Sequence, residues 1–359
     1  MDVIKEALTF DDVLLVPRYS SVLPSDTNLD IDLGNKLKLK IPFLSSAMDT
    51  VTESNMAIAI AQKGGLGIVH RNLSIVNQSN EIKKVKKKNL IVGAAIGTSF
   101  EDLQRFKSIL DAGVDLIVID TAHGHSEKVI KTLSKIKKIK SKIPICVGNI
   151  ASAEAASKLY NEGADILKVG IGPGSICTTR MIAGIGVPQI TAILEVKKSM
   201  KNKKIKIISD GGIKFSGDIV KALAAGADAI MMGSIFAGTD ESPGKKFKFK
   251  SKFYKSYRGM GSIGAMSAGS SNRYFQKNHK DKSKFVPEGV EARVPYKGTV
   301  ETILYQLQGG LRSSMGYIGA KMIKEIKKKA KFIKITKAGF YESMVHSVEK
   351  TKEVTNYKL

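Results

Sequence analysis

The segment AGVDLIVID at positions 112–120 joins a glycine turn to an apolar run, and the same phrase recurs twice further along the chain. The later copies are EGADILKVG at 162–170 and AGADAIMMG at 225–233. Each copy is typical of a helix end, a tight turn and a buried parallel strand. Between them lie segments with helical spacing, at 101–110, 126–139, 153–160, 189–200 and 217–224. The pattern therefore predicts alternating strands and helices.

The whole chain continues this alternation. Eight apolar runs, each followed by a helical stretch, favour an α/β fold of the (β/α)₈ (TIM) barrel type over a Rossmann sheet. Polar and glycine residues cluster directly after the runs, where such a barrel has its catalytic face. The expected strands span 42–46, 67–69, 91–96, 116–120, 145–148, 166–170, 206–209 and 229–233.

Length and composition fit one catalytic barrel domain over 1–359. Two cysteines cannot form a disulfide framework, and no charged-then-apolar leader opens the sequence. No apolar run approaches the 18 or so residues of a membrane span. We therefore expect a cytoplasmic protein without a membrane partner.

The net charge of +25 raises the question of a nucleic-acid partner. Of the 58 basic residues only 8 are arginine, the residue preferred for bidentate phosphate recognition, and the lysines spread over nearly every expected helix. A general lysine bias on solvated faces explains this better than a binding stripe. Nucleic acid is thus not expected as the primary partner, although a lysine-rich polyanion-binding protein remains a remote alternative.

Three segments interrupt the regular pattern. Positions 238–299, after the eighth strand, have no clear period and are rich in Gly, Ser, Lys and aromatic residues, which predicts a mobile functional flap. A C-terminal extension over 314–359 contains a basic helix and a strand-like run at 332–335, expected to pack outside the barrel or on a neighbour. Positions 83–89 form a short charged join before the third strand.

The loop KVGIGPGSICTTR at 168–180 contains one of the two cysteines. Its glycines allow the main chain to approach a ligand, and Ser175, Thr178, Thr179 and Arg180 surround the sulfur of Cys177 with polar and cationic groups that favour a thiolate. We interpret Cys177 as a covalent nucleophile. Cys146, by contrast, lies in an apolar strand-like run and is expected to be a buried core residue.

Glycine pairs after the last two strands predict a phosphate site. Barrels often bind phosphate at this point on main-chain amides, here at Asp210-Gly211-Gly212 and Gly233-Ser234. The loop YRGMGS at 257–262 adds main-chain groups that can lie along a planar base. His123 and His125 are only two residues apart with no evident third ligand, so a transition-metal site is not expected.

These motifs together resemble one family, inosine 5′-monophosphate (IMP) dehydrogenase, the NAD-dependent oxidoreductase that makes xanthosine monophosphate on the guanine nucleotide route. The likeness runs from LTFDDVLLVP at 8–17 through SSAMDTVTE at 45–53, the Cys177 loop and NRYFQ at 272–276 to Glu342-Ser343. It implies that Cys177 attacks C2 of the IMP purine, that hydride passes to NAD, and that water hydrolyses the covalent intermediate. The flap would then bring Arg273 and Tyr274 into the vacated dinucleotide site, with Arg273 acting as base toward water near Thr179.

The resemblance also assigns binding roles. It places around IMP the residues Ser46, Met48, Ser175, Asp210, Gly212, Gly233, Ser234, Tyr257, Gly259, Met260, Gly261 and Glu288. It places Asp120, Asn149 and Gly170 at the nicotinamide riboside. Main-chain carbonyls of Gly172, Gly174 and Cys177 would bind potassium together with Glu342, Ser343 and Met344 of a neighbouring subunit, which implies a homotetramer.

Three features depart from the family pattern. Members usually carry a paired regulatory CBS module where this chain has only 83–89, Met344 and Ser347 replace the His and Asp common in bacterial members, and the stretch 245–255 is unusually basic. GMP reductase, which shares the barrel and a similar cysteine loop, is the alternative. Arg273 and Tyr274 favour the dehydrogenase.

Overall fold

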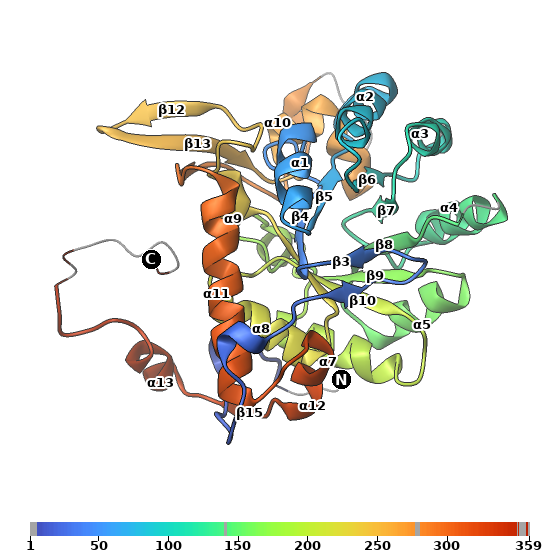
Figure 1. The fold of residues 1–359 in the computed structure, drawn as a ribbon. Coiled ribbons are helices and arrows are strands. Elements are labelled where there is room, and N and C mark those ends of the chain that lie inside the picture. The colour runs from blue at the N-terminus through green and yellow to red at the C-terminus, as the bar shows by residue number, and fades with distance from the viewer. Residues whose placement is uncertain (1–5, 140–141, 277–280, 350, 352–356, 358–359) are drawn as a thin grey trace.

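The computed structural model describes residues 6–139, 142–276, 281–349, 351 and 357, and its centre is a closed barrel of parallel strands (Figure 1). The first strand β4 and the last strand β11 pair in parallel and close the barrel. The predicted barrel is confirmed, with strand ends within two residues of those expected. The eight strands are β4 (Phe43–Ser45), β5 (Leu66–Val69), β6 (Gly93–Ile96), β7 (Leu116–Asp120), β8 (Ile145–Ile150), β9 (Ile166–Val169), β10 (Lys206–Asp210) and β11 (Ala229–Met232).

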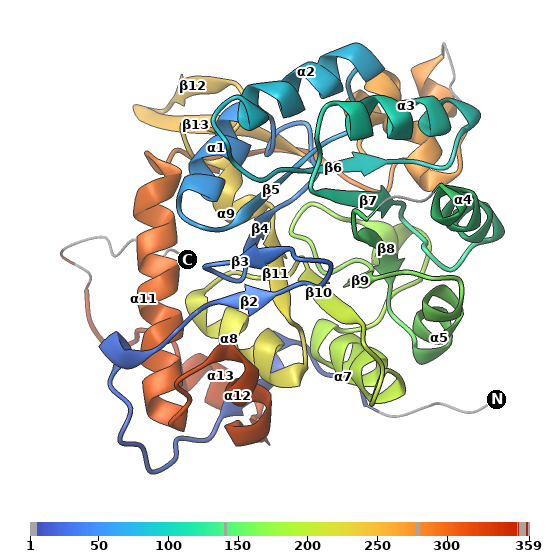
Figure 2. The ribbon, with the colours of Figure 1, turned by 45° about the vertical axis from the view of Figure 1, so that its right-hand side comes forward.

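Helices surround the barrel, as Figures 1 and 2 show. All five helical segments expected from the sequence form within one or two residues of their predicted bounds. The long helix α11 extends past position 314, so the predicted start of the C-terminal extension lies inside this helix. The surrounding helices are α1 (Ser54–Gln62), α2 (Ile75–Lys86), α3 (Phe100–Asp111), α4 (Glu127–Lys138), α5 (Ala153–Asn161), α7 (Gln189–Ser199), α8 (Ser216–Ala225) and α11 (Val300–Ile318).

The recurring Gly-x-Asp phrase has a structural explanation at the turn before each strand. Gly226 adopts a φ of +119° and ends α8 in the left-handed conformation that glycine accepts without strain. Two residues later the main-chain N–H of Asp228 donates to the Ile207 carbonyl at 2.7 Å, and its carboxylate accepts the Ile207 N–H at 2.9 Å. Asp115 and Asp165 hold Val92 and Ile145 in the same two-way manner. The aspartate therefore fixes the start of the neighbouring strand.

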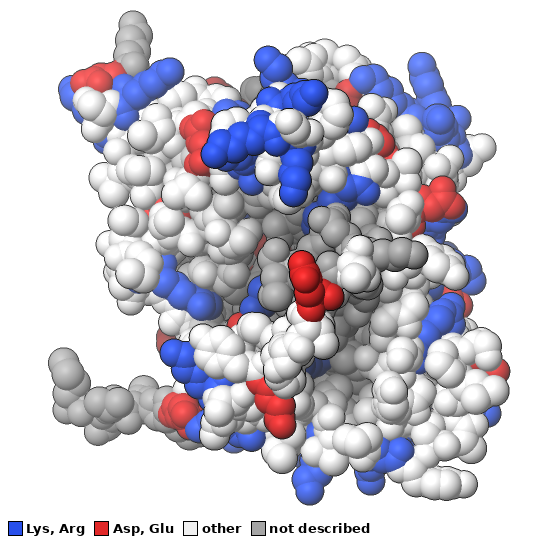
Figure 3. Space-filling view, turned by 90° about the vertical axis from the view of Figure 1, so that its left-hand side faces the viewer, with Lys and Arg blue, Asp and Glu red and all other residues white. Residues whose placement is uncertain are grey.

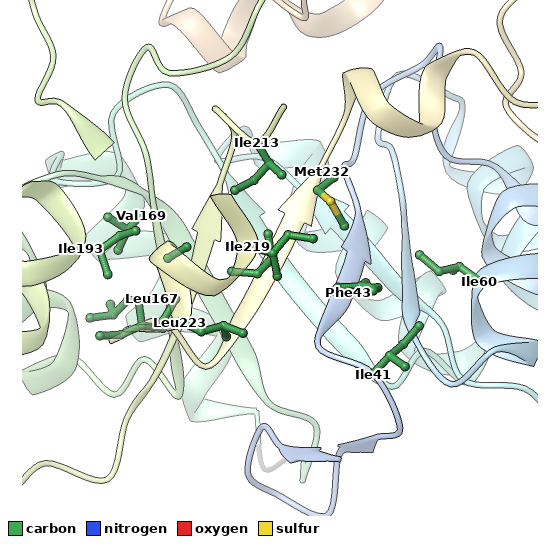
Figure 4. Close-up of a cluster of buried hydrophobic side chains, with 14 of the residues drawn as sticks. Ile41, Phe43, Ile60, Leu167, Val169, Ile193, Ile213, Ile219, Leu223 and Met232 are labelled. Atoms are coloured by element: carbon green, nitrogen blue, oxygen red, sulfur yellow. The ribbon is translucent and has the colours of Figure 1, made fainter. Parts of the chain in front are cut away.

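Two apolar layers stabilise the barrel. The outer layer lies between strands and helices, where side chains such as Phe43, Leu167 and Ile219 pack together (Figure 4). The inner layer fills the barrel and includes Cys146, whose side chain is fully buried. A short hairpin of β2 (Ile31–Asp32) and β3 (Lys38–Leu39) contributes to this inner layer and covers the N-terminal end of the barrel. The sequence analysis did not predict this hairpin.

The chain ends lie outside the barrel. Strand β15 (Phe332–Lys334) pairs antiparallel with β1 (Val13–Leu15) of the same chain, in a two-stranded sheet separate from the barrel. Helices α12 (Ile323–Lys329) and α13 (Lys337–Glu342) flank β15, and 3₁₀ turns at Phe10–Asp12 and Pro24–Asp26 flank β1. The charged join begins within α2, which ends at Lys86. None of the helices in the described ranges is long and apolar enough to cross a membrane.

The insertion 238–299 forms a small antiparallel sheet of β12 (Lys246–Phe249), β13 (Lys252–Arg258) and β14 (Glu291–Pro295). Short helical turns follow β13, at Ile263–Ala265 (α10), Met266–Ser270, Ser271–Tyr274 and Lys282–Lys284. Figure 3 shows Lys and Arg side chains gathered around the projecting β12–β13 hairpin. Lys246 Nζ lies 3.4 Å from the Tyr296 ring centroid, and Arg293 Cζ lies 3.7 Å from that of Phe249. Cation–π packing thus stabilises this basic segment. Its mobility remains a prediction.

Candidate functional site

A cavity of about 300 Å³ opens at the carboxyl ends of the barrel strands. Loops after β4, β7, β9, β10 and β11 contribute to it, together with Asn149 of β8, the insertion 238–299 and the N-terminal segment around Phe10. The sequence predicts polar residues at this end of the barrel, because the carboxyl ends of the parallel strands meet there. Residues of the expected substrate, cofactor and catalytic sets that line the cavity are Ser46, Met48, Asp120, Asn149, Gly170, Ser175, Cys177, Thr179, Asp210, Gly212, Gly233, Ser234, Tyr257, Gly259, Met260, Arg273, Tyr274 and Glu288.

Cys177 is half-buried and is one of the residues that line the cavity. Its Sγ lies 3.3 Å from Thr179 Oγ1, and the Thr179 hydroxyl donates to Glu288 Oε2 at 2.8 Å. Two main-chain bonds, from Thr178 N to the Glu288 carbonyl and from Val290 N to the Ile176 carbonyl, hold the cysteine loop against the insertion. A thiol, a hydroxyl and a carboxylate therefore form one continuous polar chain.

The second cysteine has the opposite environment. Cys146 is completely buried among the apolar side chains inside the barrel. Burial raises the pKa of its thiol to about 12, so the group stays protonated and weakly nucleophilic at neutral pH. Cys177 is the accessible one of the two thiols.

Arg180 braces the cysteine loop from behind. Its Nε donates to the Ile171 carbonyl at 3.1 Å and its Nη2 to the Val187 carbonyl at 2.6 Å. An added Cβ at Gly172 would come within 2.5 Å of the Arg180 side chain. The sequence predicts Arg180 as a cation near the Cys177 thiol. In the structure Arg180 also holds the loop in place through these two hydrogen bonds.

Lys168 stands at the centre of a buried charge network that the sequence analysis missed. Its Nζ donates to Asp120 Oδ1 and Asp210 Oδ2, each at 2.9 Å, and also to Asn149 Oδ1. Burial acts to lower the pKa of Lys168, but the two carboxylates outweigh it and the pKa is raised. Asn149 adds bonds to Asp210 and to the Gly170 carbonyl. A lysine inside the apolar run ILKV was the available signal.

Arg273 reaches from the insertion into this network. Its side chain is 13% exposed, and Nη2 lies 3.2 Å from Asp120 Oδ1. Burial acts to raise the pKa of Asp120, but Arg273 and Lys168 outweigh it and the pKa is lowered. Arg71, after β5, is also buried and exerts a further attraction on Asp120. The structure thus shows the insertion closed over Asp120.

Two tyrosines, Tyr257 and Tyr274, line the cavity. Burial raises the pKa of Tyr274 to about 12, so its hydroxyl stays protonated beside the Arg273 guanidinium. Burial also raises the pKa of Tyr257, against a hydrogen bond from Ser175 that acts to lower it. The Tyr257 hydroxyl lies beside Gly233, where an added Cβ would be 3.0 Å away. Two protonated phenols therefore face the cavity.

Some expected site residues lie elsewhere. Gly261 does not line the cavity but packs against the Tyr274 ring. Glu342, Ser343 and Met344 belong to the end of α13 and the turn after it, outside the cavity of the same chain (Figure 1). His123 and His125 have ring centroids 6.3 Å apart. Within the described ranges, no group of three or more His, Cys, Asp or Glu side chains could hold a metal ion.

The fold and the site together define a (β/α)₈-barrel enzyme with an accessible cysteine beside a buried lysine–carboxylate network. The family model described as "IMP dehydrogenase / GMP reductase domain" matches residues 7–346. The chain belongs to this family of oxidoreductases.

Curated relatives agree along the full length of the chain. Inosine-5′-monophosphate dehydrogenase of Cryptosporidium parvum is 49% identical, over 99% of this chain and 98% of its own. The proteins of the same name from Borreliella burgdorferi and Aquifex aeolicus are 48% and 42% identical, over 96% and 99% of this chain and 98% of their own.

Proposed function

We propose that this chain oxidises IMP to xanthosine 5′-monophosphate, with NAD as the hydride acceptor and Cys177 as the covalent nucleophile. The observation that carries the proposal is the position of Cys177, a half-buried residue in the lining of a cavity that Asp210, Tyr257 and Arg273 also line. The names of the relatives support the same substrate.

The proposed first half-reaction takes place at C2 of the purine. The thiolate of Cys177 adds to C2, and the hydride on that carbon leaves for the nicotinamide, which the residues Asp120, Asn149 and Gly170 would hold. The product is a thioimidate, in which sulfur remains bonded to C2. Asp210 suits the ribose hydroxyls of IMP because a carboxylate accepts two hydrogen bonds. Ser175, Tyr257 and Ser234 would hold the phosphate.

The second half-reaction is hydrolysis. Water adds to C2, loses a proton, and the thiolate of Cys177 leaves as xanthosine 5′-monophosphate forms. The Arg273 guanidinium contacts Asp120 in this structure. A nicotinamide riboside bound to Asp120 would need the same space, so Arg273 and the riboside exclude one another. Closure of the insertion would therefore separate the two half-reactions.

Two groups are candidates for the general base that accepts a proton from the attacking water. The family resemblance implies Arg273, although its pKa is raised because Asp120 outweighs the effect of burial. The chain from Thr179 Oγ1 to Glu288 Oε2 ends beside the sulfur and offers a second acceptor. We propose that Thr179 passes the proton to Glu288 while protonated Arg273 stabilises the developing hydroxide.

We further propose a potassium site on the cysteine loop, shared between subunits of a homotetramer. Gly172, Gly174 and Cys177 offer carbonyl oxygens, a ligand type suited to hard cations. The Gly174 carbonyl accepts one bond, from Cys177 N at 3.1 Å, and keeps a second lone pair. Because Glu342, Ser343 and Met344 lie outside the cavity of their own chain, they would complete the site of a neighbour. Replacing KCl by LiCl should lower both the thermal midpoint and the tetramer fraction in ultracentrifugation.

The decisive experiment supplies the full chain with IMP and NAD and follows NADH by absorbance. Mass spectrometry of the same mixture should find a purine nucleotide attached at Cys177. Cys177→Ala should remove both signals, whereas Cys146→Ala, the matched control, should keep both. Turnover of GMP with NADPH alone would instead assign the chain as a GMP reductase. Unchanged NADH formation in Cys177→Ala, with salt-sensitive RNA binding, would favour the polyanion-binding alternative.

A further inference from the structure

A second cavity, of about 460 Å³, lies at the opposite end of the barrel from Cys177. Its walls are the β2–β3 hairpin, the start of β10, the turn after α8, and α12, which Figure 2 shows close together. A bridge between Asn28 and Met322 joins the chain before β2 to the turn before α12. The hairpin and α12 are therefore fixed relative to one another.

Lysine ammonium groups without partners surround this cavity. Lys38, Lys206, Lys324 and Lys327 line it, and none of them forms an ion pair with any residue that the structure describes. Burial lowers the pKa of Lys327, and Lys197, Lys206 and Lys328 lower it further by repulsion. Asp228 attracts Lys327 in return, but the five lysines that line the cavity outnumber its three aspartates, so an excess of positive charge remains.

The carboxylates of the cavity are already engaged. Asp30 pairs with Lys40 at 3.3 Å, and Asp32 Oδ1 accepts the Gly34 N–H at 2.8 Å. Asp228 Oδ2 accepts the Ile207 N–H at 2.9 Å. Each aspartate still has lone pairs that can accept a hydrogen bond from a hydroxyl or amine group of a ligand. The cavity thus offers several cations for a polyanion and a few acceptors for neutral polar groups.

The floor of the same cavity is apolar. Leu39, Leu223 and Ile323 form it as buried side chains, and the partly exposed Met322 lies at its edge. The apolar surface open to a ligand comes from the half-buried Ile31 and from Met322, which lie over this floor's residues in the cavity lining. A bare phosphate would use the lysines but not this apolar surface. A ligand with a flat, weakly polar ring system and a polyphosphate chain would use both.

We propose that this cavity is a binding site for a nucleoside di- or triphosphate, separate from the site of Cys177. The phosphates contact Lys38, Lys324 and Lys327, and the base packs against Ile31 and Met322. The aspartates accept hydrogen bonds from the ribose or the base. The site does not depend on the reaction proposed for the catalytic cavity.

Calorimetric titration of the full chain tests this proposal, with the catalytic cavity saturated by IMP. The probes are ATP, GTP, inorganic triphosphate and adenosine at physiological salt. The triple variant Lys38→Gln/Lys324→Gln/Lys327→Gln should bind ATP or GTP at least about tenfold more weakly, because three charge-assisted contacts are lost. Its circular dichroism and NADH production should match those of the unaltered chain.

A matched control carries the same change of charge on α4. Lys128, Lys135 and Lys138 are exposed and unpaired within the described ranges, so the triple Gln variant at these positions should bind like the unaltered chain. Equal losses in both variants, or no nucleotide binding at all, would overturn the proposal. Equal affinity for inorganic triphosphate and ATP would overturn the assignment of a nucleoside.

Discussion

Replacement of Lys168 by Met tests the buried charge network directly. The variant keeps a side chain of similar length but removes the ammonium group that bonds Asp120 and Asp210. Loss of one partner from a buried ion pair costs about 3–5 kcal/mol, because a charge remains buried without compensation. Asp120 keeps Arg273 and Asp210 keeps Asn149, so we take the lower limit, ~3 kcal/mol.

Scanning calorimetry measures the expected loss as a shift of Tm. The entropy of unfolding is about 2.1 cal/mol/K per residue, or ~0.75 kcal/mol/K for the whole chain, so ~3 kcal/mol corresponds to ~4 °C. Lys158→Met is the control, since Lys158 forms only an exposed i,i+4 pair with Glu162 at 2.9 Å, worth about 0.3–0.5 kcal/mol. A Lys168→Met variant as stable as this control would refute the reasoning.

The Tm difference between the unaltered chain and Lys168→Met should depend on pH, because the pKa values of both Lys168 and Asp120 are shifted. The pKa of Lys168 is raised above 10.5, so its contribution is complete below that pH and is lost as pH rises through the raised value. The pKa of Asp120 is lowered below 3.8, so its contribution is complete above that pH and is lost as pH falls through the lowered value. The Tm difference should be largest near neutral pH and narrow toward both extremes.

Three further substitutions have definite expected outcomes. Thr179→Val removes the hydroxyl that donates to Glu288. Stopped-flow absorbance should therefore show an intact first burst of NADH, followed by steady-state turnover reduced about 10²-fold or more. Equal losses in the burst and in the steady state would contradict the proposed proton path. Gly170→Ala places a Cβ 2.2 Å from the Asp210 carbonyl at a φ of +148°, and urea unfolding should show a loss on the order of 3 kcal/mol. Gly309→Ala, in open space on α11, should instead gain about 0.5–1 kcal/mol in the same assay; a loss there would indicate a contact absent from the isolated chain.

The barrel could be predicted because its signals are local. A buried parallel strand is an apolar run, and the turn before it needs a glycine and a hydrogen-bonding aspartate within three residues of one another. The β1–β15 pair and the β2–β3 hairpin were not predicted. The pairing of β1 with β15 joins segments over 300 residues apart, and nothing within either strand specifies the other. The hairpin strands are only two residues long and carry too little periodicity to recognise.

The candidate site was predicted in part for the same reason. The Cys177 loop and the glycine pairs are contiguous motifs, and the structure brings them to one cavity. The role of Lys168 depends on Asp120 and Asp210, which end β7 and β10 and become neighbours only when these strands assemble with β8 and β9 in the barrel. An isolated lysine in an apolar strand marks such a position, but the sequence does not name its partners. The residues of α13 cannot be assigned to a site from one chain, because they lie outside its cavity.

Lys168 also explains how the insertion could open without leaving Asp120 as an isolated buried charge. Asp120 is 4% exposed and contacts both Arg273, from the insertion, and Lys168, from the barrel. If Arg273 departs to admit a nicotinamide riboside, the barrel lysine remains and keeps the carboxylate ionised and able to accept hydrogen bonds from hydroxyl groups. Because the same ammonium bonds Asp210, it holds together the carboxylates that we propose for the substrate and cofactor ends of the cavity. If the insertion and the cofactor take turns at Asp120, as we propose, this carboxylate needs a cation that is part of neither. Lys168, on barrel strand β9, is that cation.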